Sequence, residues 1–428
     1  MVRVKLAYGR SGLDVDLPDW TDVIAPRFVA GLPDEQAALR DALCAPIDSL
    51  PLADLVRPGD TVVIVHTDIT RATPNDRILP PLLAELERAG VQRDHITLLN
   101  GLGTHRKQTE AELRAMLGDA VVDGYRCLQH DCFDDDNLVS LPATSRGHPV
   151  RINRVYMEAD VKILTGFIEP HFFAGFSGGP KAILPSLAGA ESVFTNHGVQ
   201  MIGDPRAVWG ILEGNPIWEE MREVALSSEP TFLLNVTLNS DRQITGVFAG
   251  DMLQAHAAGC EFVRASAMAG VDEPYDVVIT TNSGYPLDQN LYQAVKGMSA
   301  AARVVRDGGA IIAAAACEDG LPDHGQYAAL LAQAGSPQGI LDLISQPGFQ
   351  AHDQWQVQTQ ALIQQRAEVF VYSDGLSDAQ IEQALFTKCR DIAATVAALQ
   401  RRYGPNARLC VMPDGPLTIP YVRETTPG

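Results

Sequence analysis

Residues 57–103 have the sequence RPGDTVVIVHTDITRATPNDRILPPLLAELERAGVQRDHITLLNGLG, which predicts a strand, a turn, a helix closed by Gly90 and a second strand. Apolar runs of strand length on either side of a helix are typical of a parallel sheet covered by helices. The order recurs from residue 275: strand YDVVITTNS, helix NLYQAVKGMSAAARVV, strands GGAIIAAAA and EVFVYS, and helix SDAQIEQALFTKC. The sequence therefore predicts an α/β fold with two α/β lobes and mostly parallel sheets.

The pattern is interrupted at VDEP, residues 271–274. We therefore predict an N-terminal α/β domain of residues 1–272, beginning with a hairpin in residues 1–20, and a C-terminal α/β domain of residues 273–428. Two lobes of similar size favour a ligand site in the cleft between them. In parallel sheets the carboxyl ends of the strands face one crevice, so we expect the active site there.

Composition excludes several classes of partner. The 428 residues are 46% hydrophobic, and 33 Lys+Arg against 53 Asp+Glu give a net charge of −20. This argues against a nucleic-acid or anionic-membrane partner, and an anionic substrate would need a locally positive pocket. Seven scattered cysteines indicate no disulfide framework, and neither a signal peptide nor a membrane-spanning stretch is predicted. We predict a cytoplasmic protein.

Polar side chains gather in loops after predicted strands and in one helix of the second lobe. These are Asp68 and Arg71 in HTDITRATP, His105 in GLGTHR, His171 and Lys181 in IEPHFFAGFSGGPK, His197 in TNHG, and Tyr292, Gln293 and Lys296 in LYQAVKG. Tyr292 and Lys296 are four residues apart and share a helical face. We expect the loop residues to meet at the carboxyl ends of the strands.

The glycine-rich loop Ser177-Gly178-Gly179 has two interpretations. Glycine lets backbone amides approach a bound anion closely, so a phosphate could lie there. A tight structural turn is the alternative. The loop matches neither G-x-x-x-x-G-K-[ST] nor G-x-G-x-x-G, because Pro180 follows Gly179 and Ala182 follows Lys181.

Five motifs, taken in order, resemble the nickel-pincer-nucleotide lactate racemase family. They are DITR, GTHR, PHFFAGFSGGPK, TNHG and LYQAVKG, and together they extend over most of the chain. The resemblance implies a pyridinium bisthiocarboxylic acid mononucleotide that holds nickel through two sulfur groups and a ring carbon. A histidine completes the square plane, and in some members a lysine is bonded to a thioacyl group. Square-planar coordination suits Ni(II).

The resemblance implies a role for each matching residue. His197 would be the nickel ligand, Lys181 the tethering lysine, and His105 and His171 the two bases that transfer protons. The residues expected to hold the substrate are Arg71, Tyr292, Gln293 and Lys296. Asp68 would orient a base or Arg71, and Trp355 in DQWQ resembles a segment near the cofactor, where packing is an equal alternative. The Ser177–Gly179 loop is our own candidate for phosphate contact.

The implied reaction is racemisation of a short 2-hydroxy acid such as lactate. Removing the C2 hydrogen as a proton would place a carbanion beside a carboxylate, whereas removing it as hydride leaves a stable keto acid. The cofactor would accept the hydride, and enzymes that build the cofactor would be its suppliers. The hydroxyl points to different sides in the two enantiomers, so two histidines suit a racemase.

Other functions are weighed against this one. The substrate could be another 2-hydroxy acid, such as malate, an aromatic acid or a sugar acid. A nicotinamide-dependent 2-hydroxyacid dehydrogenase would need a G-x-G-x-x-G in the proper context, which is not found. A zinc hydrolase built on His105, His171 and His197 lacks the short-range ligand pair usual in zinc sites. A carrier of the nickel cofactor would not need two bases.

Overall fold

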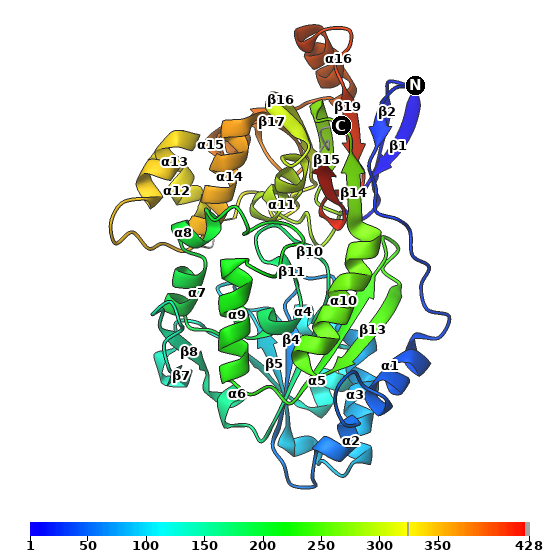
Figure 1. The fold of residues 1–428 in the computed structure, drawn as a ribbon, viewed down its shortest axis with the longest axis vertical. Helices are drawn as coiled ribbons and strands as arrows, with labels where there is room; N and C mark the ends of the chain where they lie inside the picture. Colours follow the sequence, from blue (N-terminus) through cyan, green and yellow to red (C-terminus); the bar gives the residue numbers. More distant parts are fainter. Residues whose placement is uncertain (323–324, 424–428) are drawn as a thin grey trace, which may run out of the picture.

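The computed structural model describes residues 1–322 and 325–423, which form two stacked lobes, each built on a six-stranded sheet (Figure 1). The first sheet has the order β13-β12-β9-β4-β5-β6, and all neighbours are parallel except β12 and β13. Its strands are β4 (Val62–Thr67), β5 (Ile96–Gly101), β6 (Arg126–Gln129), β9 (Val161–Phe167), β12 (Phe232–Leu238) and β13 (Ile244–Gly250). The predicted α/β class with mostly parallel sheets is confirmed.

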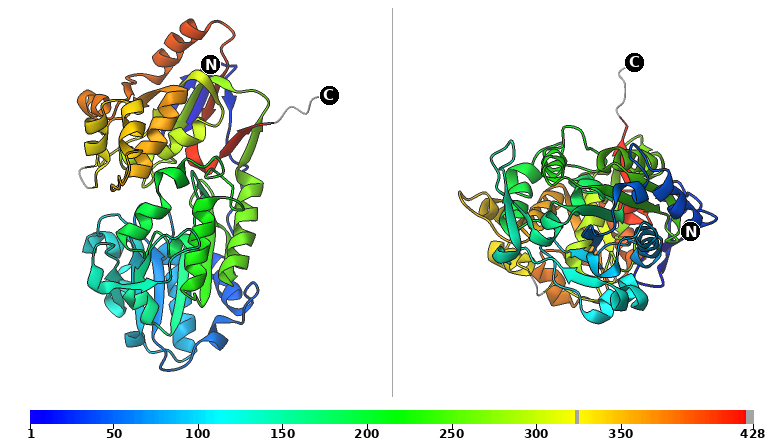
Figure 2. Two further views of the ribbon diagram at one scale, coloured as in Figure 1. Left: turned by 60° about the vertical axis from the view of Figure 1, so that its left-hand side comes forward. Right: turned by 90° about the horizontal axis from the view of Figure 1, so that it is seen from below.

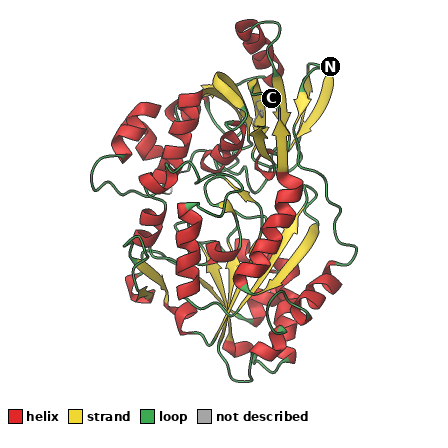
Figure 3. Cartoon of the chain, in the orientation of Figure 1, coloured by secondary structure: helices red, strands yellow, loops and turns green. Residues whose placement is uncertain are grey.

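Helices cover both faces of the first sheet (Figure 3). Val63 and Val65 of β4 pack in one hydrophobic cluster and Val62 and Ile64 in another, which explains the continuous apolar run of this strand. The helices are α1 (Glu35–Cys44), α2 (Leu52–Leu55), α3 (Asn75–Arg88), α4 (Glu110–Leu117), α5 (Asp119–Gly124), α6 (Arg154–Glu158), α7 (Ala190–Asn196), α8 (Val199–Ile202), α9 (Pro216–Ser227) and α10 (Met252–Ala267). Two small antiparallel pairs are β7 (Leu138–Leu141) with β8 (Val150–Asn153), and β10 (Pro170–His171) with β11 (Gly175–Phe176).

The second sheet has the order β18-β17-β16-β15-β19-β3 and is parallel throughout. Its strands are β3 (Asp22–Val23), β15 (Tyr275–Thr281), β16 (Val305–Ala314), β17 (Ala367–Tyr372), β18 (Thr387–Lys388) and β19 (Leu409–Met412). Its helices are α11 (Leu291–Ala301), α12 (Tyr327–Ala334), α13 (Pro337–Ile344), α14 (Gln354–Arg366), α15 (Asp378–Gln383) and α16 (Ile392–Tyr403). A short parallel pair, β14 (Met268–Val271) with β20 (Ile419–Val422), lies beside it.

The start of the chain packs with the second sheet. The predicted hairpin is present as β1 (Val2–Leu6) and β2 (Leu13–Leu17), and its Leu6 and Leu17 share a cluster with Ile279 and Ile312. We therefore call residues 25–267 the first lobe, and residues 1–24 with 268–423 the second lobe. The predicted domain boundary between residues 272 and 273 stays a prediction. The structure shows in addition that the N-terminal hairpin packs with the second lobe.

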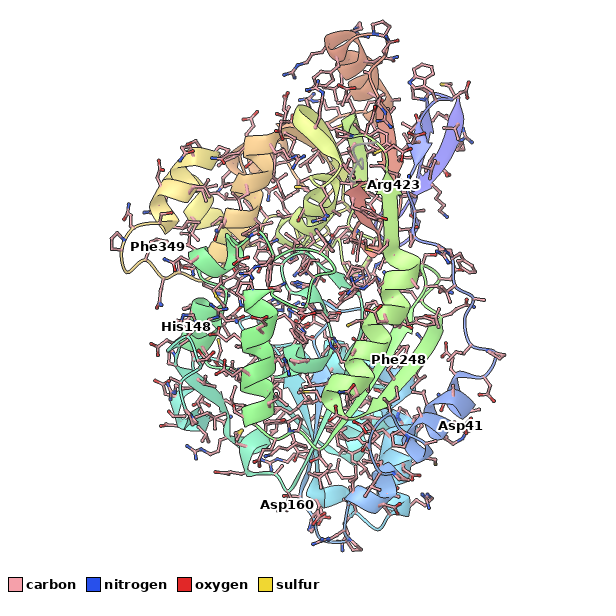
Figure 4. All side chains as sticks on the ribbon, viewed as in Figure 1. Asp41, His148, Asp160, Phe248, Phe349 and Arg423 are labelled. Carbon is pink, nitrogen blue, oxygen red and sulfur yellow. The ribbon has the colours of Figure 1, made fainter. Side chains whose placement is uncertain are left out.

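The carboxyl ends of the first sheet's strands face the second lobe. Asp160 directly precedes β9 and lies at the end of the first lobe remote from the second lobe (Figure 4). β9 therefore runs toward the second lobe, and its parallel neighbours β4 and β12 run with it. The chain crosses between the lobes through the segment before α1 and again from α10 to β14 (Figure 2). Within the described residues no helix is long and apolar enough to cross a membrane.

Candidate active site

A cavity of about 90 Å³ lies between the lobes and brings most of the predicted site residues together. The predicted residues in its wall are Asp68, Arg71, His105, His171, Lys181, His197, Tyr292, Lys296 and Trp355. The first six come from the first lobe: His171 ends β10, Lys181 lies in a 3-10 helix of residues 179–182, and the other four lie outside helices and strands. The last three come from α11 and α14 of the second lobe. Phe172, Phe173 and Leu102 add apolar surface. The expected site in the cleft is thus formed by residues far apart in the sequence.

His105 is paired with a buried carboxylate. Its Nδ1 lies 2.6 Å from Oδ2 of Asp68, and the Thr70 hydroxyl donates a 2.8 Å hydrogen bond to the other oxygen. Burial alone would raise the pKa of Asp68, but His105, Arg71 and the Thr70 hydroxyl together lower it. Asp68 therefore stays ionised and orients His105, whose side chain keeps 28% of its surface exposed.

His171 lies in a different setting. It pairs with Gly175 in the β10–β11 hairpin, and its ring packs against those of Phe172 and Phe173, with centroids 4.7 and 4.6 Å away. The Ala174 amide donates a 3.2 Å hydrogen bond to its Nδ1. Burial, followed by the charges of Lys181, Arg71 and Lys296, holds the pKa of His171 well below its usual value. The imidazole is therefore neutral.

The cavity carries the positive charge that the acidic chain lacks elsewhere. Arg71 contacts Glu169 at 3.4 Å, a partly buried pair. Burial and Arg71 lower the pKa of Lys296 to about 7, although Glu169 and Asp68 act in the opposite direction. Burial, followed by the charges of Arg71 and Lys296, lowers the pKa of Lys181 well below its usual value. A neutral Lys181 amine is nucleophilic, as covalent attachment requires.

His197 is buried between aromatic rings of both lobes. Its ring meets Phe173 edge-on at 4.9 Å and Trp355 at 5.2 Å. Burial, followed by the charge of Lys181, holds its pKa well below the usual value, so the imidazole is neutral, as metal ligation requires. Its Nδ1 is buried and has no hydrogen-bond partner among the described residues.

The residues from the second lobe form a connected group. Trp355 Nε1 donates to the Tyr292 hydroxyl at 2.8 Å, and Gln356 binds the Tyr292 carbonyl oxygen. Gln293 is buried, and its Oε1 accepts a hydrogen bond from Lys296 Nζ. It lines a smaller adjoining cavity together with Asp68, His105 and Tyr292, and its contact with the substrate stays a prediction.

The Ser177–Gly179 loop does not line the cavity, and its polar groups bind other parts of the protein. The Gly179 amide donates to Asn235 Oδ1 at 2.9 Å, and the Ser177 carbonyl oxygen is 2.9 Å from Nε2 of His256. A Cβ on Gly178 would lie 2.5 Å from Asn235 Oδ1, and one on Gly179 2.5 Å from the His256 ring. Close packing therefore explains the two glycines, and a phosphate contact by this loop stays a prediction.

The described residues contain no group of three His, Cys, Asp or Glu side chains that could hold a metal ion. The zinc alternative needs such a group from His105, His171 and His197. The Asp68 partner of His105 and the aromatic surroundings of His197 give these histidines separate settings.

Comparisons with known proteins agree with the motifs. The model of the lactate racemase N-terminal domain matches residues 8–210, and that of the lactate racemase C-terminal domain matches residues 271–419. A lactate racemase of Thermoanaerobacterium thermosaccharolyticum is 35% identical over 99% of this chain and 100% of its own length. The chain belongs to the lactate racemase family. It is therefore an isomerase, and its kind of reaction is racemisation.

Further relatives of this racemase agree. A lactate racemase of Lactiplantibacillus plantarum is 38% identical over 89% of this chain and 90% of its own. The apoprotein structure of the Thermoanaerobacterium thermosaccharolyticum racemase superposes with a TM-score of 0.90 at 34% identity, covering 99% of this chain and 100% of that one. A Thermotoga maritima protein shares the fold, with a TM-score of 0.70 at 19% identity over 92% of this chain and 100% of that one.

Two residues of the racemase site were missed by the sequence reasoning. Glu169 directly precedes the PHFF motif and is the carboxylate that contacts Arg71. Gln356 follows Trp355, lines the cavity and is fully buried. A charged residue inside an apolar strand-end segment was the available signal for Glu169, whereas a glutamine in a helix carries no comparable signal.

Proposed function

We propose that this racemase interconverts the D- and L-enantiomers of lactate with a nickel-pincer nucleotide as cofactor. The observation that carries the proposal is the single cavity in which residues of all five motifs meet. Both curated relatives described above are named lactate racemases. Phe172, Phe173 and Trp355 line this cavity and give it apolar surface, and we favour a short aliphatic acid as the substrate.

The residues present fit the cofactor. His197 would bind the nickel, because it is neutral, buried and has an unpartnered ring nitrogen. Lys181 would form the covalent link, because its buried amine is held neutral. Trp355 and Phe173 flank His197 and limit access of water to the metal. The chemistry that the bound cofactor supplies is reversible acceptance of a hydride.

The chain's own residues would bind the substrate and move its hydroxyl proton. Arg71 can grip a carboxylate with two parallel hydrogen bonds, and Lys296 adds a second charge on the opposite lobe. His105, held by Asp68, would take the hydroxyl proton through Nε2. His171 would serve the enantiomer whose hydroxyl points the other way, after a change of tautomer frees its Nε2, because the Ala174 amide occupies its Nδ1. Closure of the lobes around the substrate would exclude water.

The test is a chiral assay on protein produced together with the cofactor-building enzymes. We expect racemisation of lactate from either enantiomer, and no activity from protein produced without those enzymes. With C2-deuterated lactate in ordinary water, the product should keep its label, because a transferred hydride does not mix with solvent protons. Washout of the deuterium would overturn the mechanism. A panel with malate, aromatic and sugar 2-hydroxy acids tests the substrate choice.

A further inference from the structure

Helix α14 begins with QWQVQTQ, residues 354–360, and is buried on nearly all sides although every second residue is a glutamine. A buried amide destabilises a fold unless it finds hydrogen-bond partners. The amides of Gln356, Gln360 and Gln364 bind carbonyl oxygens of the second lobe, those of Tyr292, Ala384 and Leu385. The amide of Gln365 binds the Gln338 side chain in the second lobe, whereas Gln354 and Gln358 reach the first lobe.

The two glutamines that cross the lobe boundary lie four residues apart, on one face of the helix. Gln354 Nε2 donates to the Phe194 carbonyl oxygen at 3.3 Å, and Gln358 Nε2 donates to the Val199 carbonyl oxygen at 2.9 Å. Between them on the same helix, Trp355 contacts the ring of His197. Three side chains of one helix therefore hold one short segment of the opposite lobe.

That segment contains His197. Phe194 lies in the last turn of α7, which ends at Asn196, and Val199 is the first residue of α8. The last carbonyls of a helix have no partner within it. Here the Gly198 amide donates a hydrogen bond to the Thr195 carbonyl oxygen. The Phe194 carbonyl oxygen accepts its hydrogen bond from the side chain of Gln354. His197 thus sits in a break between two short helices, with each side of the break bound to α14.

We propose that Gln354 and Gln358 are positioning residues for His197, which they fix in its ligating place only while the lobes are closed. The inference rests on the proposed function, in which His197 binds nickel. Separation of the lobes would break both amide contacts and withdraw Trp355 from His197, whereas the remaining glutamine contacts of α14 would stay intact within the second lobe. Lobe opening and loosening of the His197 ligand are then one event.

The test compares Gln358→Met with Gln364→Met, because each removes one amide that binds a backbone carbonyl and keeps the side-chain volume. Only the first contact crosses the lobes. In cofactor-free protein, amide hydrogen exchange of residues 194–199 should rise in Gln358→Met and not in Gln364→Met. In loaded protein, nickel loss to a chelator should be about 10–100-fold faster in Gln358→Met, as for other residues that orient a metal ligand.

Gln354→Met is the second variant and should act in the same direction. If Gln358→Met folds and loses nickel at the wild-type rate, with unchanged exchange at residues 194–199, the positioning role is overturned. Equal effects of Gln358→Met and Gln364→Met would overturn it too, because they would reflect a general loss of stability. If wild-type protein produced with the cofactor-building enzymes holds no nickel, the proposed function itself fails, and the inference fails with it.

Discussion

Oδ2 of Asp68 lies 2.6 Å from Nδ1 of His105, and this contact joins the loop after β4 to the loop after β5. A carboxylate in this place keeps the proton on Nδ1 and leaves the lone pair on Nε2 for a substrate. It also stabilises the imidazolium that forms when His105 accepts a proton. The pair thus fixes the orientation of the His105 ring and would make it the base that the proposed function requires.

We expect Asp68→Asn to lower kcat/KM by roughly 10²–10⁴-fold, because the loss of charge weakens the base and its orientation. Nickel content should not change, since Asp68 is paired with His105 and not with His197. Glu112→Gln is the control, because Glu112 pairs with Arg106 beside the same loop. Lactate racemisation kinetics and metal analysis are the measurements. Wild-type kinetics in Asp68→Asn would disprove the role.

The two histidines should differ in tautomer. Nδ1 of His171 accepts the Ala174 amide, so the neutral ring carries its proton on Nε2, opposite to His105. Imidazole nitrogen-15 chemical shifts of the cofactor-free protein should show this difference. We assign the signals with His105→Gln and His171→Gln. If both rings carried the proton on the same nitrogen, one of the two contacts at Nδ1, from Ala174 to His171 or from Asp68 to His105, would not have the assigned direction, and the predicted difference in tautomer would be wrong.

Lys296 should make substrate capture pH-dependent. Its pKa of about 7 means that it is charged below pH 7 and neutral above, so kcat/KM for an anionic acid should fall as pH rises through about 7. Lys296→Arg should move this descending limb to higher pH, because arginine stays charged. A pH profile of kcat/KM measures both. A descending limb at the same pH in wild type and Lys296→Arg would assign it to another group.

Lys181 should carry the covalent link to the cofactor. Mass spectrometry of loaded, denatured protein should find a mass increment on the peptide containing Lys181, and Lys181→Gln should lose it. Lys162→Gln is the control, because Lys162 is also a buried lysine, but its Nζ is occupied by the Ser228 carbonyl oxygen. An increment that persists in Lys181→Gln would place the attachment elsewhere.

Three buried histidines should make the fold less stable as the pH falls from 6.5 toward 4. Burial lowers the pKa of His66, His130 and His256 to about 4, against 6.5 in the unfolded chain. The unfolded chain therefore binds more protons between these values, so stability is present above pH 6.5 and falls as pH drops toward 4. Each site contributes roughly 3 kcal/mol at most. The stability gap between wild type and His256→Gln, from urea unfolding, should narrow as pH falls. A constant gap would contradict this.

Local signals in the sequence predicted local structure well. The helix expected within residues 57–103 is α3 (Asn75–Arg88), and Gly90, predicted to close it, has a positive φ of 96°. The helix expected over residues 377–389 instead ends at Gln383. Leu385 adopts a positive φ of 64°, and Thr387 and Lys388 join the sheet edge. Tertiary strand pairing decided that end, and sequence periodicity does not report it.

The site was predictable where chemistry marks a residue and not where packing does. A histidine or lysine that follows a predicted strand indicates a site in the crevice, whatever its neighbours are. The structure places four such residues in the cavity wall: His105, His171, Lys181 and His197. The glycines at positions 178 and 179 look the same whether they face a phosphate or Asn235. Only the tertiary contact distinguishes the two. The glutamines of α14 were overlooked for the same reason.

The return of the N-terminal hairpin to the second lobe has a consequence for synthesis of the chain. Leu6 and Leu17 are synthesised before the first lobe, and their partners Ile279 and Ile312 follow roughly 270–300 residues later. At 5–20 residues per second, the hairpin waits roughly 15–60 s with its apolar face uncovered. The first lobe can complete its own sheet in that interval. The hairpin is therefore synthesised before the first lobe but can complete its packing only after the first lobe has been synthesised.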